Sequence, residues 1–438
     1  MIKELRVEHW KSFEQATLYI DPLTILIGPN ASGKSNLLDA LVFLQRVGSG
    51  ADIDEAVNGS SVLPALRGGA SAVCRKPSHW FALEALIGQT GQPDCRYRIK
   101  VWADLISVTA FEETLYLMSD AMIGGNESEE RIFWTKRIDP EEDLQPRLEL
   151  HPTLGEIEHR VHVRGQFLEA NWRTKSGEVK QTQSVGASRT YLQYLPPFEF
   201  SDVFLDCVRR VRINLERIFV FDPVPSAMRD VAALSDRLEP DGSNVAGVLA
   251  ALDSERQKSV EKTLTDYVKG LPERDIQRVW AQRLGVLEND AMLYCEEGWA
   301  CPGEPPIDAR TMSDGTLRFL AIITAMLLRP QGSLLVIEDA DNGLHPSRAR
   351  LLIDMLRTLG KERGIDVLTT THNPALIDAA GVRMLPFLIV AHRDESTGAS
   401  RLTPVEDIGQ LPKLLAGGSL GQLATAGRIQ SALAAGNG

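Results

Sequence analysis

Residues 28–35, GPNASGKS, combine glycines, a lysine and a serine at the spacing of a phosphate-binding loop. The apolar run LTILI at 23–27 precedes them and an amphipathic run follows, so a buried strand leads in and a helix leads out. Backbone N–H groups of such a loop bind phosphate oxygens together with the helix start. Lys34 would reach the β and γ phosphates of a nucleotide, and the Ser35 hydroxyl would be a ligand of Mg²⁺. The residues expected to hold the nucleotide are Gly28, Asn30, Gly33, Lys34, Ser35 and Asn36.

A second apolar run, at 334–337, ends abruptly in the acids Glu338, Asp339 and Asp341. Burying such carboxylates without a positive partner would be costly. Because the strands of a parallel sheet end at the same edge, we expect Glu338 to face the Mg²⁺ held beside Ser35. Asp339 then points toward the γ-phosphate, where a water must be oriented and deprotonated. Alternatively these acids only cap the next helix, an interpretation that fits Asp341 better than Glu338.

Two further segments complete the set of candidate residues. Ser313 and Gly315 belong to SDGT, which opens the apolar helix expected at 317–328 and could form a second anion-binding helix start. Taken alone, SDGT is better explained as a plain N-cap. The other segment, LTTTHNP, delivers His372 at the polar end of a buried strand. A structural histidine is the alternative there, but its place one strand after the acidic one suits a sensor of the γ-phosphate.

The elements that must position these residues indicate a mixed α/β fold. Alternating polar and apolar positions before residue 23 predict a short antiparallel strand pair, and residues 80–117 predict an antiparallel sheet. Beyond Ser313 strands alternate with helices, which implies a mostly parallel sheet with helices on both faces. The expected strands are 333–338, 365–370 and 384–391, and the expected helices are 346–361 and 373–380.

Composition limits the classes of function. The formal charge of −12 argues against general affinity for nucleic acid. The amphipathic helix expected at 204–218 carries four arginines that could form a local basic face, although a solvated helix face is the simpler interpretation. The five cysteines are odd in number and lack metal-ligand spacing, so we expect that none of them binds a metal ion or forms a disulfide. Without a signal peptide or a membrane-length apolar run, we expect a soluble cytoplasmic protein that does not contact a membrane.

The order GPNASGKS, SDGT, IEDADNGLHP and TTHNP resembles the ABC-type ATPases of the RecF, SMC and overcoming-lysogenization-defect (OLD) kind, which are grouped with AAA-family ATPases of prokaryotic DNA repair and phage defence. The similarity begins at the first residues, resumes near 219 and covers residues 118–200 poorly. It implies a P-loop NTPase fold with an N-terminal antiparallel β subdomain and an inserted α/β lobe. The expected divisions are an N-terminal ATPase lobe at 1–117, an insertion and helical region at 118–218, and a C-terminal ATPase lobe at 219–438.

The resemblance also implies roles for matching residues. The loop at 28–35 would bind ATP with Mg²⁺, Glu338 would be the acid on the metal side, and Asp339 the catalytic base. Ser313 and Gly315 would contact the γ-phosphate held by the opposite protomer of a head-to-tail dimer. His345 would lie in the loop between the two protomers, and His372 would be the switch histidine.

One departure from the family concerns the acidic run. Where the family usually shows Glu-Glu-Pro-Glu, this chain has Glu338, Asp339, Ala340 and Asp341. The base would therefore be shorter by one methylene, and because a displacement of roughly 1 Å can cost about a hundredfold in rate, we expect slow turnover. No glutamine could be assigned to the loop that normally helps to bind the metal.

The function implied is an ATP-gated conformational switch in DNA-linked anti-phage defence, as in the Septu-like and retron-associated systems. Too few residues follow His372 for the nuclease domain of OLD-type proteins, so a separate effector protein, a nuclease or a toxin, is the expected partner of a homodimer or higher oligomer. The alternative is a RecF-like ATPase that binds DNA in recombination repair. A transporter subunit is not expected, because no coupling surface is recognisable.

Overall fold

The computed structural model describes residues 1–89, 91–103, 108–123, 126–136, 167–168, 171–173, 179–181, 185–186, 190, 192–193, 202–271, 276–298, 305–409 and 411–436. The chain divides into two compact units. Unit 1 comprises Met1–Tyr19, Asp39–Ile218 and Gly398–Arg401, and unit 2 comprises Ile20–Leu38, Phe219–Thr397 and Leu402–Gly438. Much of the insertion and helical region expected at 118–218 lies outside the described residues, as does Cys301. The expected division into three lobes remains a prediction.

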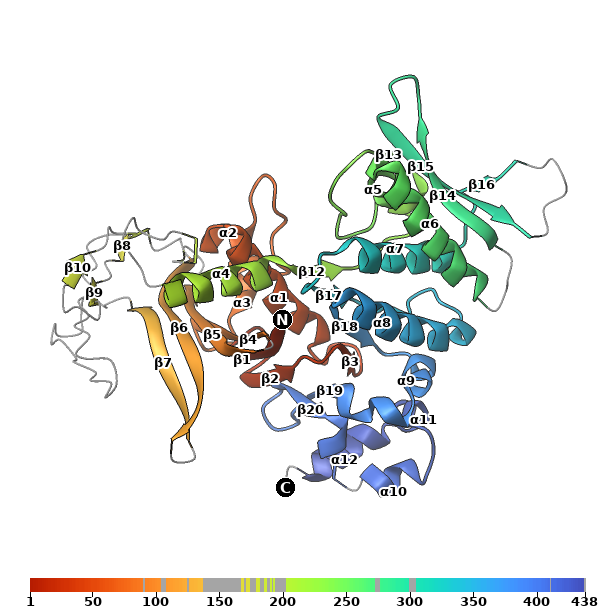
Figure 1. Cartoon of the computed structure of the whole chain (residues 1–438). Helices are drawn as coiled ribbons and strands as arrows, with labels where there is room; N and C mark the ends of the chain where they lie inside the picture. The colour runs from red at the N-terminus through yellow and green to blue at the C-terminus, as the bar shows by residue number, and fades with distance from the viewer. Residues whose placement is uncertain are drawn as a thin grey trace. The chain divides into compact units, whose positions relative to one another are not determined.

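Unit 1 is built on a six-stranded sheet in the order β2-β1-β4-β5-β6-β7, in which the described pairs are antiparallel (Figure 1). Alternation explains the sheet, since Cys95, Tyr97 and Ile99 are buried while the residues between them are partly exposed. This confirms the antiparallel sheet predicted near the N-terminus, which extends beyond residue 117. Its strands are β1 Ile2–Glu8, β2 Gln15–Tyr19, β4 Trp80–Gln89, β5 Gln92–Ala103, β6 Val108–Ile123 and β7 Asn126–Lys136. Short strands and helices complete the unit: β8 Phe167–Leu168, β9 Asn171–Arg173, β10 Val179–Gln181, β11 Val185–Gly186, α2 Ile53–Asn58 and α3 Gly69–Val73.

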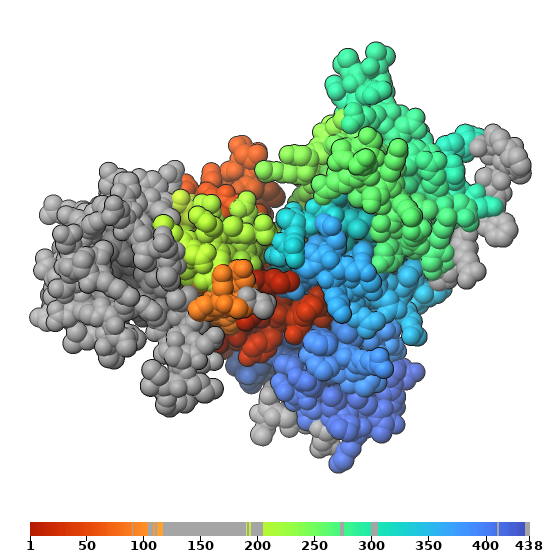
Figure 2. Space-filling view, viewed as in Figure 1, coloured from red at the N-terminus to blue at the C-terminus, as the bar shows by residue number. Residues whose placement is uncertain are grey.

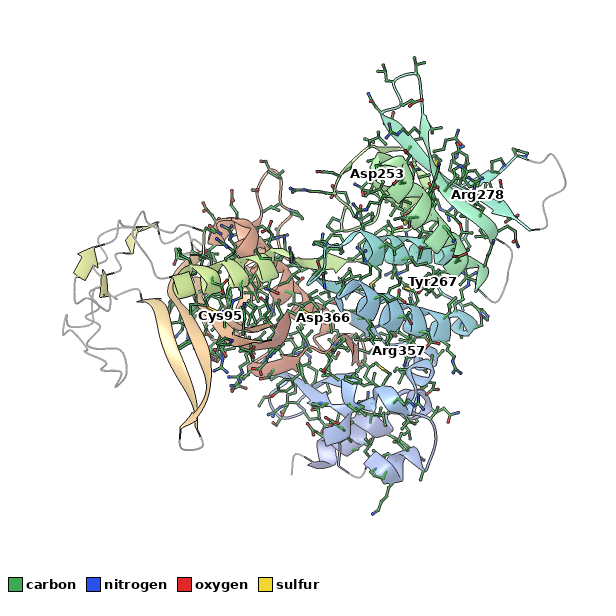
Figure 3. All side chains as sticks on the ribbon, viewed as in Figure 1. Cys95, Asp253, Tyr267, Arg278, Arg357 and Asp366 are labelled. Atoms are coloured by element: carbon green, nitrogen blue, oxygen red, sulfur yellow. A yellow bond between two sulfur atoms is a disulfide. The ribbon has the colours of Figure 1, made fainter. Side chains whose placement is uncertain are left out.

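Helix α4 (Asp202–Glu216) packs on this sheet against β4 and β5 (Figure 1). Its face of Val208, Val211 and Leu215 is buried, as the spacing predicts. The same packing brings Cys207 onto Cys95, and the two form a disulfide across 112 residues of sequence (Figure 3). The expectation that no cysteine pairs was therefore wrong, because sequence spacing cannot show which helix covers which strand.

Unit 2 contains the predicted mostly parallel sheet, with strands in the order β12-β17-β18-β3-β19-β20. The described pairs of β17, β18, β3 and β19 are parallel, and their aliphatic residues are buried on both faces. The bounds are β3 Leu23–Ile27, β12 Ile218–Phe221, β17 Leu334–Ile337, β18 Asp366–Thr371, β19 Leu388–Arg393 and β20 Ser400–Pro404. The helices that follow or precede these strands are α1 Lys34–Ser49, α7 Asp314–Leu328, α8 Ala349–Arg363 and α9 Pro374–Ala380. The alternation of strands and helices is confirmed.

One predicted strand is shorter than expected. Residues 382–387 form a 3₁₀ helix, η3 (Val382–Phe387), and extended structure begins only at Leu388. Pro386 lacks the N–H that a sheet ladder needs, so this part of the apolar run cannot pair as a central strand. The strand expected at 384–391 was therefore wrong in its first half.

The residues between β12 and α7 in the sequence form a lobe of unit 2 that carries a small antiparallel sheet. Val279, Ala291 and Leu293 are buried on the side where the sheet contacts α5 and α6, and Figure 2 shows the residues of this lobe in green to teal on the surface. Its elements are η1 Ala227–Arg229, β13 Ala232–Ala233, α5 Val245–Ala251, α6 Ser254–Lys269, β14 Ile276–Leu284, β15 Asp290–Glu297 and β16 Ile307–Asp308.

The C-terminal helices of unit 2 pack beside α9. Asp378 of α9 accepts hydrogen bonds from the Ser419 hydroxyl (2.9 Å) and from Gly421 N (2.7 Å), which fixes the start of α11. The elements are η4 Val405–Asp407, α10 Leu411–Leu415, α11 Leu420–Thr425 and α12 Arg428–Gly436. Within the described part of the chain, no helix is both long and apolar enough to span a membrane.

Asp366, at the start of β18, gives a test of how the core sheet is stabilised (Figure 3). Its side chain belongs to a residue only 6% exposed, and burial raises its pKa to about 6. The unfolded chain titrates near ~4, so the folded state binds the extra proton and stability falls as the pH rises from about 4 to about 6. We expect Asp366→Asn to raise the free energy of unfolding at neutral pH by roughly 1–3 kcal/mol.

Urea unfolding at several pH values measures this effect. Above about pH 6 the variant should exceed the wild type in stability, and the gap should close toward about pH 4. Asp266→Asn, an exposed carboxylate on α6, is the matched control and should show no such window. A pH-independent difference between Asp366→Asn and the wild type would contradict the assignment.

Candidate functional site

The loop at 28–35 leaves β3 and enters α1 through backbone conformations that favour glycine. Gly28 has φ +152° and Gly33 has φ +111°. A Cβ atom at Gly28 would stand 2.3 Å from the carbonyl oxygen of Ala391 on β19, so only glycine fits there. Arg393 Nε donates to Ala31 O (2.9 Å) and fastens the loop to the end of β19. The glycine loop between a buried strand and a helix is therefore present as its pattern predicts, and phosphate binding by this loop remains a prediction.

Lys34 lies in this loop with its side chain almost completely buried. Its Nζ donates to Gly28 O (2.7 Å) and Pro29 O (3.1 Å). Burial lowers the pKa of Lys34, and the nearby carboxylates Asp339 and Glu338 oppose that shift. A buried ammonium group held by neutral carbonyls can exchange these acceptors for the oxygens of an anion.

The Ser35 hydroxyl donates to Glu338 Oε1, which joins the start of α1 to the residue that follows β17. Glu338 is held in place from the other side, where its N–H donates to Phe221 O of β12 (3.1 Å). No cluster of three or more metal-binding side chains occurs among the residues that the structure describes. A hydroxyl and a carboxylate do fit Mg²⁺, which takes one or two such ligands together with substrate phosphates.

Asp339 adopts a left-handed backbone conformation, φ +44°. Its N–H donates to Thr370 Oγ1 (2.8 Å), and Thr370 Oγ1 donates to its Oδ1 (3.3 Å). His372 Nδ1 lies 3.6 Å from the same Oδ1. Aspartate and asparagine tolerate this conformation better than longer side chains do, which gives a backbone reason for an aspartate at this position.

The SDGT segment forms the start of α7. Ser313 Oγ accepts a hydrogen bond from Thr316 N (3.1 Å), so the serine is an N-cap, as its simpler interpretation predicts. Gly315 lies against the loop that follows β17, where a Cβ atom would stand 2.6 Å from Gly343 O. Gly315 thus borders the loop that begins with Glu338 and Asp339.

The acids after β17 do not cap the next helix. Asp341 is buried, whereas His345 Nδ1 accepts the N–H of Ser347 (3.3 Å) and caps η2 (Pro346–Arg348). The alternative in which Asp341 caps the next helix is therefore wrong, because the chain turns through Gly343 before the helix begins. A role for His345 between protomers remains a prediction.

Three functional candidates were missed by reasoning from the sequence: Asp222, Arg318 and Thr370. Asp222 follows the apolar strand IFVF as Glu338 follows LLVI, a parallel that could have marked it. Thr370 stands in the run TTT beside the predicted histidine. Arg318 lies in the apolar helix α7, and nothing in its local pattern indicates which carbonyls it contacts.

The chain is similar to known proteins over part of its length. Residues 23–73 and 302–378 match the family described as "AAA domain, putative AbiEii toxin, Type IV TA system". Over 113 residues the chain is 33% identical to the energy-coupling factor transporter ATP-binding protein EcfA2 of a Bacillus cereus strain, and 32% identical to that of Bacillus thuringiensis (strain Al Hakam). These matches cover 25% of this chain and 36% of each relative, so the chain spans about a third of the length of these curated proteins.

Solved structures with a similar arrangement include an SMC head bound to the C-winged helix domain of ScpA, with a TM-score of 0.48 at 11% identity, covering 92% of this chain and 96% of that one. The SMC head domain from Thermotoga maritima has a TM-score of 0.41 at 14% identity, covering 92% of this chain and 98% of that one. The sheet and the loop at 28–35 have the strand, glycine loop and helix of a mixed α/β P-loop fold. Over residues 23–73 and 302–378 the chain is similar to the AAA-domain family, and over 113 residues it is similar to transporter ATP-binding proteins.

Gly315 allows a test of the contact between α7 and the loop after β17. We expect Gly315→Ala to destabilise the protein by roughly 1–3 kcal/mol, because the added methyl group meets a backbone carbonyl that cannot move freely. Gly409→Ala is the matched control, since nothing lies within 4 Å of a Cβ atom there. Thermal unfolding measures both variants, and equal melting temperatures for the two would show that the approach at Gly315 is not tight.

Proposed function

We propose that the protein binds ATP with Mg²⁺, hydrolyses it and uses the cycle as a conformational switch. The observation that carries the proposal is the contact of the Ser35 hydroxyl with the Glu338 carboxylate, beside the buried Lys34. These three groups come from the ends of two different strands of one parallel sheet. Nucleotides bind at such an edge in open α/β sheets.

Each side chain has a task that follows from its chemistry. Lys34 exchanges the carbonyls of Gly28 and Pro29 for phosphate oxygens, and the N–H groups of the loop donate to the others. Ser35 and Glu338 would hold Mg²⁺, which when bound neutralises the charge that develops on the phosphate oxygens. Asp339 accepts the proton of the attacking water. His372, whose Nδ1 lies 3.6 Å from Asp339 Oδ1, keeps this carboxylate oriented.

The switch would act through assembly of two copies. Ser313 and Gly315 form a helix start that would reach the nucleotide of a second protomer, so that ATP holds a head-to-tail dimer together. The resemblance to defence ATPases supports a role in DNA-linked anti-phage defence with a separate nuclease or toxin as effector. The description of the matched family names a toxin and a TA system, which fits that role.

Direct DNA binding through α4, as a RecF-like repair ATPase would use, is not part of the proposal. Arg210 is engaged within the fold, where it pairs with Asp206 (2.9 Å) and donates to Pro93 O (2.8 Å). Arg209 and Arg212 remain exposed and would be the residues to change if gel-shift binding were found.

Nucleotide binding is tested with Lys34→Ala. Because the lysine is expected to contact two phosphates, the variant should lose ATP affinity by more than about a hundredfold, measured by titration calorimetry with Mg²⁺ present. Lys262→Ala, which removes an exposed lysine from α6, should bind as the wild type does. Equal affinities for Lys34→Ala and Lys262→Ala would rule out the proposed site.

The role of Asp339 is tested with Asp339→Asn, which keeps a residue type that tolerates φ +44°. Turnover should fall by about 10²–10⁴-fold with little change in ATP affinity, as loss of a general base predicts. Asp339→Glu adds the methylene that the base lacks and should raise turnover above that of the wild type, but by less than about a hundredfold, because the longer side chain adds strain of roughly 1 kcal/mol at this backbone position. If Asp339→Asn hydrolyses ATP like the wild type, another residue is the base.

A further inference from the structure

Arg318 is a buried arginine in the first half of α7, 4% exposed, whose guanidinium group reaches three acceptors. It donates to Pro223 O (2.7 Å), to Asp222 Oδ1 (2.9 Å) and to Glu338 O (2.8 Å). Two of these acceptors follow β12 and the third follows β17. The guanidinium group therefore ties the start of α7 to the edge of the sheet that carries the acids.

The acceptor Glu338 O belongs to the peptide group between the two acids assigned to metal binding and proton transfer. The N–H of the same peptide group belongs to Asp339 and donates to Thr370 Oγ1 (2.8 Å). Arg318 and Thr370 thus hold one peptide group by its oxygen and by its nitrogen. This grip matters because Asp339 has φ +44°, a conformation that costs energy and persists only where neighbouring groups fix it.

Stability alone does not account for Arg318. Its Nε is buried and has no hydrogen-bond partner among the described residues, so the side chain carries a desolvation cost that a leucine or methionine in the same apolar helix would avoid. A planar guanidinium group can serve three acceptors in fixed directions, which neither an apolar side chain nor a lysine can do equally well. The arginine is therefore better explained by the geometry that it imposes.

We propose that Arg318 is a positioning residue for the hydrolytic site: its hydrogen bond to Glu338 O fixes the Glu338–Asp339 peptide group and so aims both carboxylates. The inference rests on the proposed ATPase function. It also links the two halves of that function, because Arg318 and the N-cap Ser313 lie on the same helix. A displacement of the α7 start would pass through Arg318 to the peptide group that carries the acids.

The test separates positioning from folding and from nucleotide binding. Arg318→Met keeps much of the length of the side chain and removes its donors. Turnover should fall about a hundredfold, as a shift of roughly 1 Å predicts, while ATP affinity stays within about threefold because Lys34 and the loop at 28–35 are untouched. Arg318→Lys should recover part of the rate, since it restores a cationic donor.

Thr370→Val removes the hydroxyl that accepts the N–H of the same peptide group, and it is a smaller change than Arg318→Met. It should lower turnover with unchanged ATP affinity, and its effect should be non-additive with that of Arg318→Met, because both residues hold one group. Arg283→Met is the control. The Nε of Arg283 on β14 donates to Ala250 O (3.0 Å), in a lobe that carries none of the residues assigned to the nucleotide, so turnover should stay within about twofold of the wild type.

The possible failures are distinguishable. Hydrolysis that survives Lys34→Ala contradicts the proposed ATPase site itself. Hydrolysis that is lost in Lys34→Ala but intact in both Arg318→Met and Thr370→Val contradicts only the positioning role. A loss in Arg318→Met that is matched by a parallel loss of ATP affinity, or additive effects of the two substitutions, would likewise overturn it. If Arg318→Met does not fold, Arg318→Lys and Thr370→Val decide the question by the same two measurements.

Discussion

The hydrogen bond between Ser35 and Glu338 is the contact on which the rest of the site depends. It joins residues 303 positions apart in the chain, one after β3 and the other after β17. Those strands are not neighbours, since β18 lies between them. The serine and the carboxylate can meet only if all three strands are parallel and end at one edge, so the contact requires the whole order of the sheet.

The register of these strands explains why the remaining groups stand where they do. Ile337, the last residue of β17, pairs with Thr369, while Thr371 pairs with Ile27 at the end of β3. β18 therefore continues two residues past the end of β17. That overhang places Thr370 beside the N–H of Asp339 and His372 near its carboxylate. The left-handed backbone conformation of Asp339 costs energy, and the packing of a sheet whose aliphatic residues are buried offsets that cost.

Local patterns were enough to predict the parts of this site that chemistry makes recognisable. A glycine loop followed by lysine and serine, and acids at the end of an apolar strand, each have few alternative explanations. Contacts that depend on tertiary packing have no comparable local pattern in the sequence. The Cys95–Cys207 disulfide depends on which helix covers β5, and the strand predicted before Leu388 failed at Pro386 because one residue outweighed an apolar run.

Helix α7 shows how a pattern can hide a functional residue. Its residues from Gly315 to Met326 are all buried, so it reads as a core helix with a single misplaced charge. A buried charge in such a helix must be hydrogen-bonded. The backbone carbonyl groups just beyond the ends of the sheet strands can act as its acceptors. Arg318 is therefore directed to the ends of β12 and β17 by the requirement for hydrogen bonds. The apolar surroundings that make the arginine costly to bury also fix its direction, so that one helix carries both the N-cap Ser313 and the arginine that holds the peptide group between the acids.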